Sequence, residues 1–273
     1  MDNEHWQLDG TAAELYQRYL VPAITSKWAQ DLVARVQPRA GEAVLDVACG
    51  TGAVARVAAK GGARVTGLDL NAGMLAVARG VQSPGGQINW IEGSALDLPF
   101  PSDSFDVVLC QLGLQFFPNP ERALREMRRV LRSHGRAALS VYSPIERTPG
   151  ANAFVLALDD VLGAEASRIK RSEHSFVDTT QLETQLKGAG FDCVDVRAVV
   201  QTIAFPSVLD YVRFQLLATP MTVLLQDLRE PERQATIASV ASKTTALSTP
   251  QMLDGGRFVF PQEAYVAIAR GSR

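Results

Sequence analysis

The segment of residues 44–55, VLDVACGTGAVA, constrains the fold more than any other part of the chain. It starts with a short apolar run typical of a buried strand, turns at Gly50 and Gly52, and continues into residues 53–62, whose alanines and valines have helical spacing. A strand, a glycine turn and a helix in this order form the first part of a βαβ unit. Ligands of open α/β sheets bind at such turns, because the backbone N–H groups that begin the helix face the crevice beyond the strand ends.

The alternation of apolar strands and amphipathic helices continues to residue 142. Further helices are predicted at residues 71–80 and 119–135, where Asn71 suits an N-cap and Pro120 suits a first turn. Further strands are predicted at residues 63–70, 88–93, 104–111 and 135–142. We therefore expect an α/β fold with a parallel sheet and helices on both faces.

After residue 142 the alternation breaks, and residues 144–178 contain a helical stretch without a strand candidate. The core then resumes with a helix and a strand and closes with a last strand, at residues 179–190, 191–205 and 263–271. We expect residues 1–40 to form an N-terminal helical lid. Residues 41–273 should form one core with cap insertions at about 144–178 and 206–257.

Composition limits the possible partners. With 27 basic and 29 acidic side chains the net charge is −2, so no overall field would gather nucleic acid or an anionic membrane. Three cysteines lie far apart without metal-ligand spacing, which predicts neither a disulfide framework nor a metal site. An acidic N-terminus and the lack of any run of about 18 apolar residues favour a cytoplasmic protein without a membrane span. No feature indicates an oligomeric state.

The glycine turn alone permits two kinds of cofactor. Residues 50–55 satisfy the G-x-G-x-x-G/A pattern of nicotinamide and flavin sites, in which the backbone approaches a pyrophosphate. Asp46 would repel a pyrophosphate but would attract an amino group or a sulfonium cation. Asp69 stands about twenty positions further on, where a carboxylate accepts the ribose hydroxyls of either cofactor.

A longer series of motifs distinguishes between these two kinds of cofactor. The stretch EGSALDLPFPSDSFDVVLCQLGLQFFPNPERALREMRRVLRSHGR, together with VLDVACGTG and GLDLNAGMLAVAR, resembles the class I S-adenosylmethionine-dependent methyltransferases, particularly the ubiquinone and menaquinone group. The resemblance covers residues 41–142 and extends to the last strand. It implies a Rossmann-like, seven-stranded, mostly parallel sheet with an antiparallel last strand. It also implies methyl transfer from S-adenosylmethionine, by in-line displacement, to a small apolar or aromatic metabolite. The alternatives are an NAD(P)-dependent oxidoreductase and a methyltransferase fold that binds the cofactor without transferring a methyl group.

The resemblance also implies a set of cofactor contacts. The methionine end would lie against the glycine loop and Asp46, the ribose on Asp69, and the adenine between apolar side chains and the segment after the third strand. The residues so implied are Tyr19, Asp46, Ala48, Gly50, Thr51, Gly52, Asp69, Leu70, Met74, Gly93, Ser94, Ala95, Leu96 and Gln111. Ser94 departs from the family, which usually has Asp there, so the adenine amino group would lack a charged acceptor.

The acceptor side is defined by fewer residues. His174 is the candidate general base, and its alternative is an exposed side chain beside Glu173. Tyr16 and Tyr19 lie three positions apart in a predicted helix and could close over the site together, or could simply pack. The predicted substrate-binding residues are Tyr16, Gln115, Phe116 and Phe176.

Overall fold

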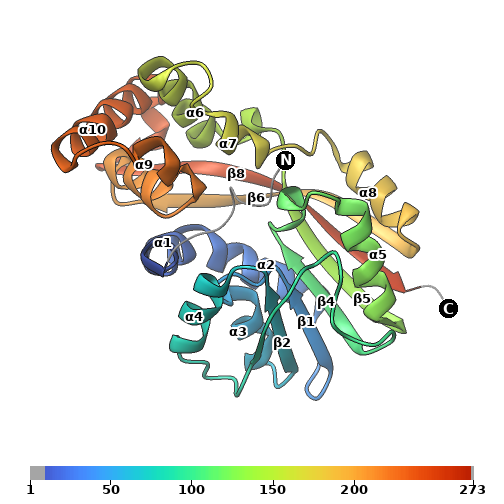
Figure 1. Ribbon diagram of the computed structural model, residues 1–273. Helices are drawn as coiled ribbons and strands as arrows, with labels where there is room; N and C mark the ends of the chain where they lie inside the picture. Colours follow the sequence, from blue (N-terminus) through green and yellow to red (C-terminus); the bar gives the residue numbers. More distant parts are fainter. Residues whose placement is uncertain (1–9, 272–273) are drawn as a thin grey trace.

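A mixed sheet forms the centre of the molecule in the computed structural model, which describes residues 10–271 (Figure 1). Its strands are β1 Ala43–Val47, β2 Arg64–Asp69, β3 Asn89–Glu92, β4 Phe105–Gln111, β5 Leu131–Tyr142, β6 Phe191–Phe205 and β8 Arg257–Gly271. They lie in the order β3-β2-β1-β4-β5-β8-β6, and the two-residue strand β7 Leu253–Asp254 pairs with the start of β8. Strands β1 to β5 run parallel, and β8 is antiparallel to both β5 and β6. The predicted α/β fold with an antiparallel last strand is confirmed.

Helices cover both faces of this sheet. The core helices are α3 Ala53–Lys60, α4 Ala72–Gly80, α5 Pro120–Val130 and α8 Thr179–Gly188. Asn71 and Asn119 cap α4 and α5 by accepting the N–H groups of Met74 and Arg122 at 3.0 and 2.9 Å. Alternate residues of β4 enter two separate apolar cores, because successive side chains of a strand point to opposite faces. Val107 and Leu109 join the core that includes α3, and Val108 and Cys110 join the core that includes α5 and α8.

Two strands begin earlier than their apolar runs predict. Helix α5 ends at Val130, and β5 begins at Leu131 because that buried residue already pairs with Phe105 across a β-bulge. The last strand begins at Arg257 instead of residue 263. Its added residues pair with the end of β6, so that Phe258 lies opposite Phe205 and both side chains are buried.

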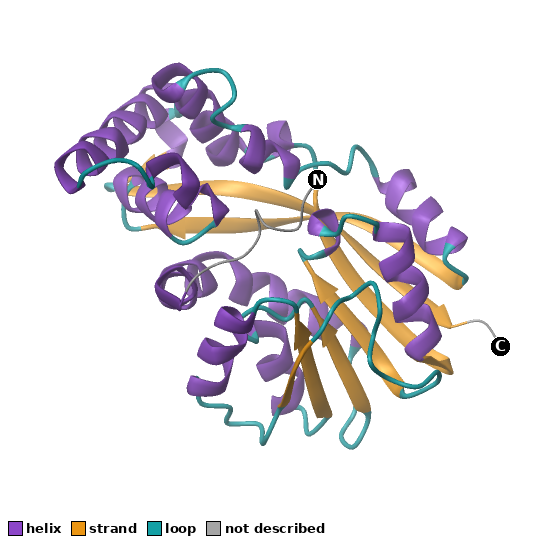
Figure 2. Cartoon of the chain, viewed as in Figure 1, coloured by secondary structure: helices purple, strands orange, loops and turns teal. Residues whose placement is uncertain are grey.

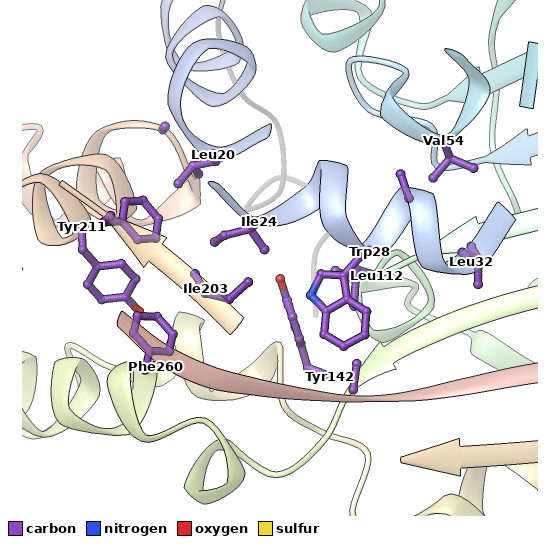
Figure 3. Close-up of a cluster of buried hydrophobic side chains, with 14 of the residues drawn as sticks. Leu20, Ile24, Trp28, Leu32, Val54, Leu112, Tyr142, Ile203, Tyr211 and Phe260 are labelled. Carbon is purple, nitrogen blue, oxygen red and sulfur yellow. The ribbon is translucent and has the colours of Figure 1, made fainter. Parts of the chain in front are cut away.

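This extra length makes β6 and β8 into a two-stranded arm that carries the cap helices (Figures 1 and 2). The cap helices are α6 Pro149–Leu162, α7 Arg168–Ser172, α9 Val208–Leu217 and α10 Glu230–Leu247. Tyr211 of α9 holds the cap on the arm, since its ring packs within 5.0–5.5 Å of the rings of Phe154, Phe205, Phe258 and Phe260. Figure 3 shows Tyr211 and Phe260 together on this side of the buried cluster.

The N-terminal segment lies between the cap and the parallel half of the sheet (Figure 1). It consists of α1 Gly10–Leu15, the π-helix η2 Tyr16–Thr25 and α2 Ser26–Val36. Pro22, which has no N–H to donate, stands inside η2, where an ordinary α-helix is predicted. The side chain of Trp28 anchors the segment, because its Nε1–H donates to Gln262 Oε1 at 2.7 Å. Within the described residues, no helix combines the length and the apolar character that crossing a bilayer requires.

Candidate functional site

A cavity of about 260 Å³ opens at the carboxyl ends of the parallel strands. Its floor comes from the segments that follow β1, β2, β3, β4 and β5, so each strand delivers residues to the same edge of the sheet. Its roof comes from η2, from α7 and from the region where α9 ends. The cavity therefore lies between the core, the N-terminal segment and the cap, and its size is near the lower end, about 300 Å³, of small-molecule sites.

Asp69 organises the floor. Its Oδ2 accepts the N–H of Gly50 at 2.7 Å, and its Oδ1 accepts the N–H of Asn71 at 2.8 Å. Burial raises the pKa of this carboxyl, while the hydrogen bonds from Asn71 and Gly50 oppose the shift. Each carboxylate oxygen can accept about two hydrogen bonds, so Asp69 keeps acceptor sites for a ligand.

The glycine loop between β1 and α3 needs both of its glycines. Gly50 has φ +54°, and Gly52 has φ +85°, conformations that favour glycine. A Cβ on Gly52 would stand 2.2 Å from Cη2 of Trp90, so the ring packs directly against this turn. Ala48 and Leu112 also have positive φ values, 55° and 51°, without being glycine, and both line the cavity. Such backbone conformations concentrate at functional sites.

Asp46 lies beneath the loop instead of in the cavity. The side chain is buried, and its Oδ2 accepts the N–H of Ala55 at 2.9 Å. Burial raises its pKa to about 8, which the hydrogen bond from Ala55 opposes. Asp46 contacts a small neighbouring hollow that it shares with Thr51 and Gln111. The hydroxyl of Thr51 is buried there and has no hydrogen-bond partner among the described residues.

Gln111 joins the core to the N-terminal segment at the end of β4. Its Nε2 donates to the carbonyl of Thr25 in η2 at 3.2 Å. Its Oε1 is buried without a hydrogen-bond partner in the described part of the chain. Since a buried acceptor without a donor is unfavourable, this oxygen is available to a ligand that donates a hydrogen bond.

Most of the predicted site residues meet at this cavity. Those that line it are Tyr16, Ala48, Gly50, Asp69, Leu70, Met74, Gly93, Ser94, Ala95, Leu96, Gln111 and Phe116. Leu70 is 43% exposed, which leaves an apolar side chain available at the rim. The hydroxyl oxygen of Ser94 accepts the N–H of Leu96 at 3.1 Å, so the turn after β3 is held by its own side chain.

Besides Asp46, Thr51, Gly52 and His174, three further predicted residues do not line the cavity. Tyr19 does not share a face with Tyr16, because the segment is π-helical; its ring stacks on Phe214 at 3.9 Å. Gln115 turns back along its own chain and donates from Nε2 to the carbonyl of Leu112 at 3.0 Å. Phe176 is buried in the core that includes α5 and α8, away from the cavity.

His174 fits neither of its two sequence interpretations. It is buried instead of exposed, and its ring stacks on Tyr142 with the ring centroids 4.9 Å apart. Nδ1 lies 2.7 Å from the carbonyl oxygen of Ser143, which can only accept, so Nδ1 carries the proton. Nε2 is enclosed and does not face the cavity. Burial lowers the pKa of His174 to about 3, so the ring is neutral and a weak base.

Several cavity residues escaped sequence reasoning. They are Leu20, Ile24, Tyr142, Lys170, Glu173, Gln215 and Thr219. Tyr142 could have been found, because it ends a predicted strand beside the one that ends in Gln111. Figure 3 shows its ring beside Trp28 with the hydroxyl directed toward Ile24. The others come from the N-terminal segment and the cap, where no sequence pattern marks a site.

Comparison with known proteins decides the family. A family model described as a methyltransferase domain matches residues 45–139. The demethylmenaquinone methyltransferase of Clavibacter sepedonicus is 33% identical over 181 residues, a match that covers 62% of this chain and 74% of that protein. The chain belongs to the class I S-adenosylmethionine-dependent methyltransferases. The demethylmenaquinone methyltransferase of Thermobifida fusca is 36% identical over 140 residues. That match covers 50% of the present chain and 58% of the Thermobifida protein.

Solved structures share the fold of the methyltransferase. A methyltransferase-like structure from Bacillus halodurans C-125 has a TM-score of 0.58 at 22% identity and covers 90% of this chain and 99% of its own. Phosphoethanolamine N-methyltransferase 2 of Haemonchus contortus, in complex with S-adenosylhomocysteine, has a TM-score of 0.57 at 18% identity and covers 90% of this chain and 53% of its own.

S-adenosylmethionine is the cofactor of the methyltransferase, and the cavity suits it. The cofactor carries hydroxyl groups and an amino group, which are hydrogen-bond donors. The cavity offers acceptors to such donors, namely the remaining lone pairs of Asp69 and the unpartnered Oε1 of Gln111. The comparisons give no support to the NAD(P)-dependent oxidoreductase that the glycine turn alone permits.

Proposed function

We propose that the cofactor lies along the floor of the cavity, with its ribose hydroxyls donating to Asp69. The support is that both oxygens of Asp69 are held in place by backbone N–H groups and keep acceptor capacity. In this placement Leu70 and Met74 pack against the adenine, and the turn from Gly93 to Leu96 borders its edge. The serine hydroxyl at position 94 is a neutral acceptor, so the adenine amino group gains no charged partner there.

At the other end we propose that Gly50, Gln111 and Asp46 receive the methionine part. Gly50 borders the cavity with its backbone, and Gln111 offers Oε1. Asp46 is 1% exposed, so it acts from beneath the loop, where a positive charge nearby would favour its ionised form. Tyr19 is not part of this proposal, because its ring is covered by Phe214.

We propose a small, largely apolar metabolite as the methyl acceptor. The remaining wall of the cavity carries apolar side chains, among them Leu20, Ile24, Phe116 and Phe117. When bound, the cofactor supplies a methyl group that is already activated for in-line displacement. The protein's part is then to hold the acceptor in line with that methyl group and to exclude water. Nothing in the net charge of −2 favours a nucleic acid as the acceptor.

The experiment is transfer of a labelled methyl group from the cofactor to a fraction of small apolar metabolites, followed by mass spectrometry of the product. We expect a labelled small molecule whose formation needs the intact chain and is inhibited by S-adenosylhomocysteine. Absence of a labelled small molecule, with label transferred instead to nucleic acid or protein supplied in a parallel reaction, would contradict the proposed acceptor class. A cytoplasmic location stays a prediction, which the free cysteines Cys49, Cys110 and Cys193 favour.

A further inference from the structure

A buried ion pair lines the cavity. Lys170 Nζ lies 2.6 Å from Glu173 Oε2, and each side chain is only 7% exposed. In every other ion pair of residues 10–271, both side chains are at least 18% exposed. Burying two charges gains little stability over apolar residues of the same size, because desolvation offsets their attraction. A pair kept at this depth on a cavity wall therefore points to a task in that cavity.

The surroundings of the pair are aromatic and polar. Lys170 Nζ lies 5.7 Å from the centroid of the Tyr142 ring, a cation–π distance. Burial raises the pKa values of the phenols of Tyr16 from η2, Tyr142 from β5 and Tyr211 from α9, and the charge of Glu173 adds to each shift. All three phenols therefore stay protonated. Beside Lys170, burial and the lysine charge lower the pKa of His174, so this ring stays neutral.

Lys170 and Glu173 can each form further hydrogen bonds. An ammonium group has three N–H donors, and Lys170 makes one hydrogen bond, to Glu173, among the described residues. The Glu173 carboxylate can accept more bonds than the one from Lys170. Burial raises the pKa of Glu173, while the charge of Lys170 opposes the shift. On the same wall Gln215 is buried, and its Oε1 has no partner in the described part of the chain.

We propose that Lys170 and Glu173 activate an acceptor that carries an acidic hydroxyl group, a phenol or an enol, and that the methyl group goes to its oxygen. This inference rests on the proposed methyl transfer. Glu173 takes the hydroxyl proton, and the ammonium of Lys170 stabilises the resulting oxyanion. An electron pair of the oxyanion forms the bond to the methyl carbon, while the carbon–sulfur bond breaks and leaves its electron pair on sulfur. The proton on Glu173 returns to water after the product has left.

The charge of the pair favours a hydroxyl acceptor over an amine. Lys170 and Glu173 together are neutral, so a neutral hydroxyl compound enters without an electrostatic penalty. A protonated amine would bring a second positive charge next to Lys170 in a medium of low dielectric constant. The pair as found serves both products of hydroxyl ionisation, since the carboxylate takes the proton and the ammonium holds the anion.

The test uses 4-nitrophenol as the probe, because its phenolate is yellow and its phenol is colourless. The full chain, saturated with S-adenosylhomocysteine, is titrated with the probe over a range of pH. We expect the wild type to bind it as phenolate, with at least a tenfold higher ratio of phenolate to phenol than in free solution. Lys170→Met together with Glu173→Gln removes both charges at similar volume and leaves no unpaired buried charge. This double variant should lose the tenfold preference and keep its affinity for S-adenosylhomocysteine.

The matched control is the exposed cap pair Lys243 and Asp160, which is 2.9 Å apart. The double variant Lys243→Met with Asp160→Asn also removes one positive and one negative charge. It should keep the wild-type preference for bound phenolate. A bound phenolate preference that is equal in the wild type and the Lys170/Glu173 variant would overturn the inference and leave the pair structural. A probe bound by the wild type only as neutral phenol would overturn it even if the double variant did not fold.

A second arm compares 1-naphthol with 1-naphthylmethylamine, an amine that is protonated at neutral pH, as acceptors of labelled methyl. We expect methylation of the naphthol oxygen and at least a tenfold lower rate with the amine. Methylation of the amine in preference to the naphthol would overturn the hydroxyl assignment while leaving methyl transfer established. Failure of the wild type to bind S-adenosylhomocysteine at all would instead count against the proposed function.

Discussion

Replacing Asp69 by alanine should weaken the binding of S-adenosylhomocysteine. The carboxylate accepts the N–H groups of Gly50 and Asn71, at 2.7 and 2.8 Å, lines the cavity and keeps acceptor capacity for a ligand. Hydrogen bonds to a charged group are worth about 1.5–3 kcal/mol, so their loss should raise the dissociation constant roughly 10- to 150-fold. Isothermal titration calorimetry measures this change directly. An unchanged dissociation constant would refute the ribose assignment.

Asp69 also holds the glycine loop, and a second ligand separates the two effects. The 2′-deoxy form of S-adenosylhomocysteine lacks one ribose hydroxyl, so the wild type should bind it more weakly while Asp69→Ala should bind both ligands about equally. Asp97→Ala is the control. This exposed carboxylate lies in the turn after β3, next to cavity residues, but does not itself line the cavity. If Asp69→Ala weakened both ligands by the same factor, the carboxylate would act on the loop alone.

Three further substitutions test other parts of the account. Asp46→Asn should make the free energy of unfolding less sensitive to pH. The pKa of Asp46 rises to about 8 on folding, so wild-type stability must fall as pH rises from about 4 to 8. If urea unfolding gave the same stability difference between variant and wild type at about pH 5 as at about pH 8, this reasoning would be contradicted. Gly52→Ala should lower the free energy of unfolding by about 1–3 kcal/mol, because the new Cβ would lie 2.2 Å from the Trp90 ring and the backbone φ of +85° at position 52 disfavours alanine. An unchanged melting temperature would show that the Trp90 ring moves aside without cost. Phe176→Leu should lower stability by about 1–2 kcal/mol with no change in S-adenosylhomocysteine affinity, and a tenfold loss of affinity would return this residue to the site.

The floor of the site was predictable because its residues follow a local rule. In a parallel sheet the segments after successive strands meet at one edge, so the strand ends place Gly50 and Asp69 there, and the family resemblance adds Ser94 and Gln111. The turn glycines and the N-cap at Asn71 mark those ends in the sequence. The strand boundaries at Leu131 and Arg257 were less accessible, since they depend on pairing with Phe105 and β6.

The roof was not predictable because it depends on contacts between distant segments. Lys170 and Glu173 lie at a five-residue helix, and their burial follows from contacts with Tyr142 of β5 and with the cap segment Pro220–Leu225. His174 reads as exposed beside Glu173, yet the stack on Tyr142 encloses it. Phe176 is only two residues away in sequence but enters the core on the other face of the sheet.

The most direct test of the central claim is a pair of titrations of the full chain, one with S-adenosylhomocysteine and one with NADH. The account predicts saturable binding of S-adenosylhomocysteine that Asp69→Ala weakens roughly 10- to 150-fold, and no binding of NADH at the same concentrations. Saturable binding of NADH without binding of S-adenosylhomocysteine would contradict the assignment of the cavity to the methyl donor.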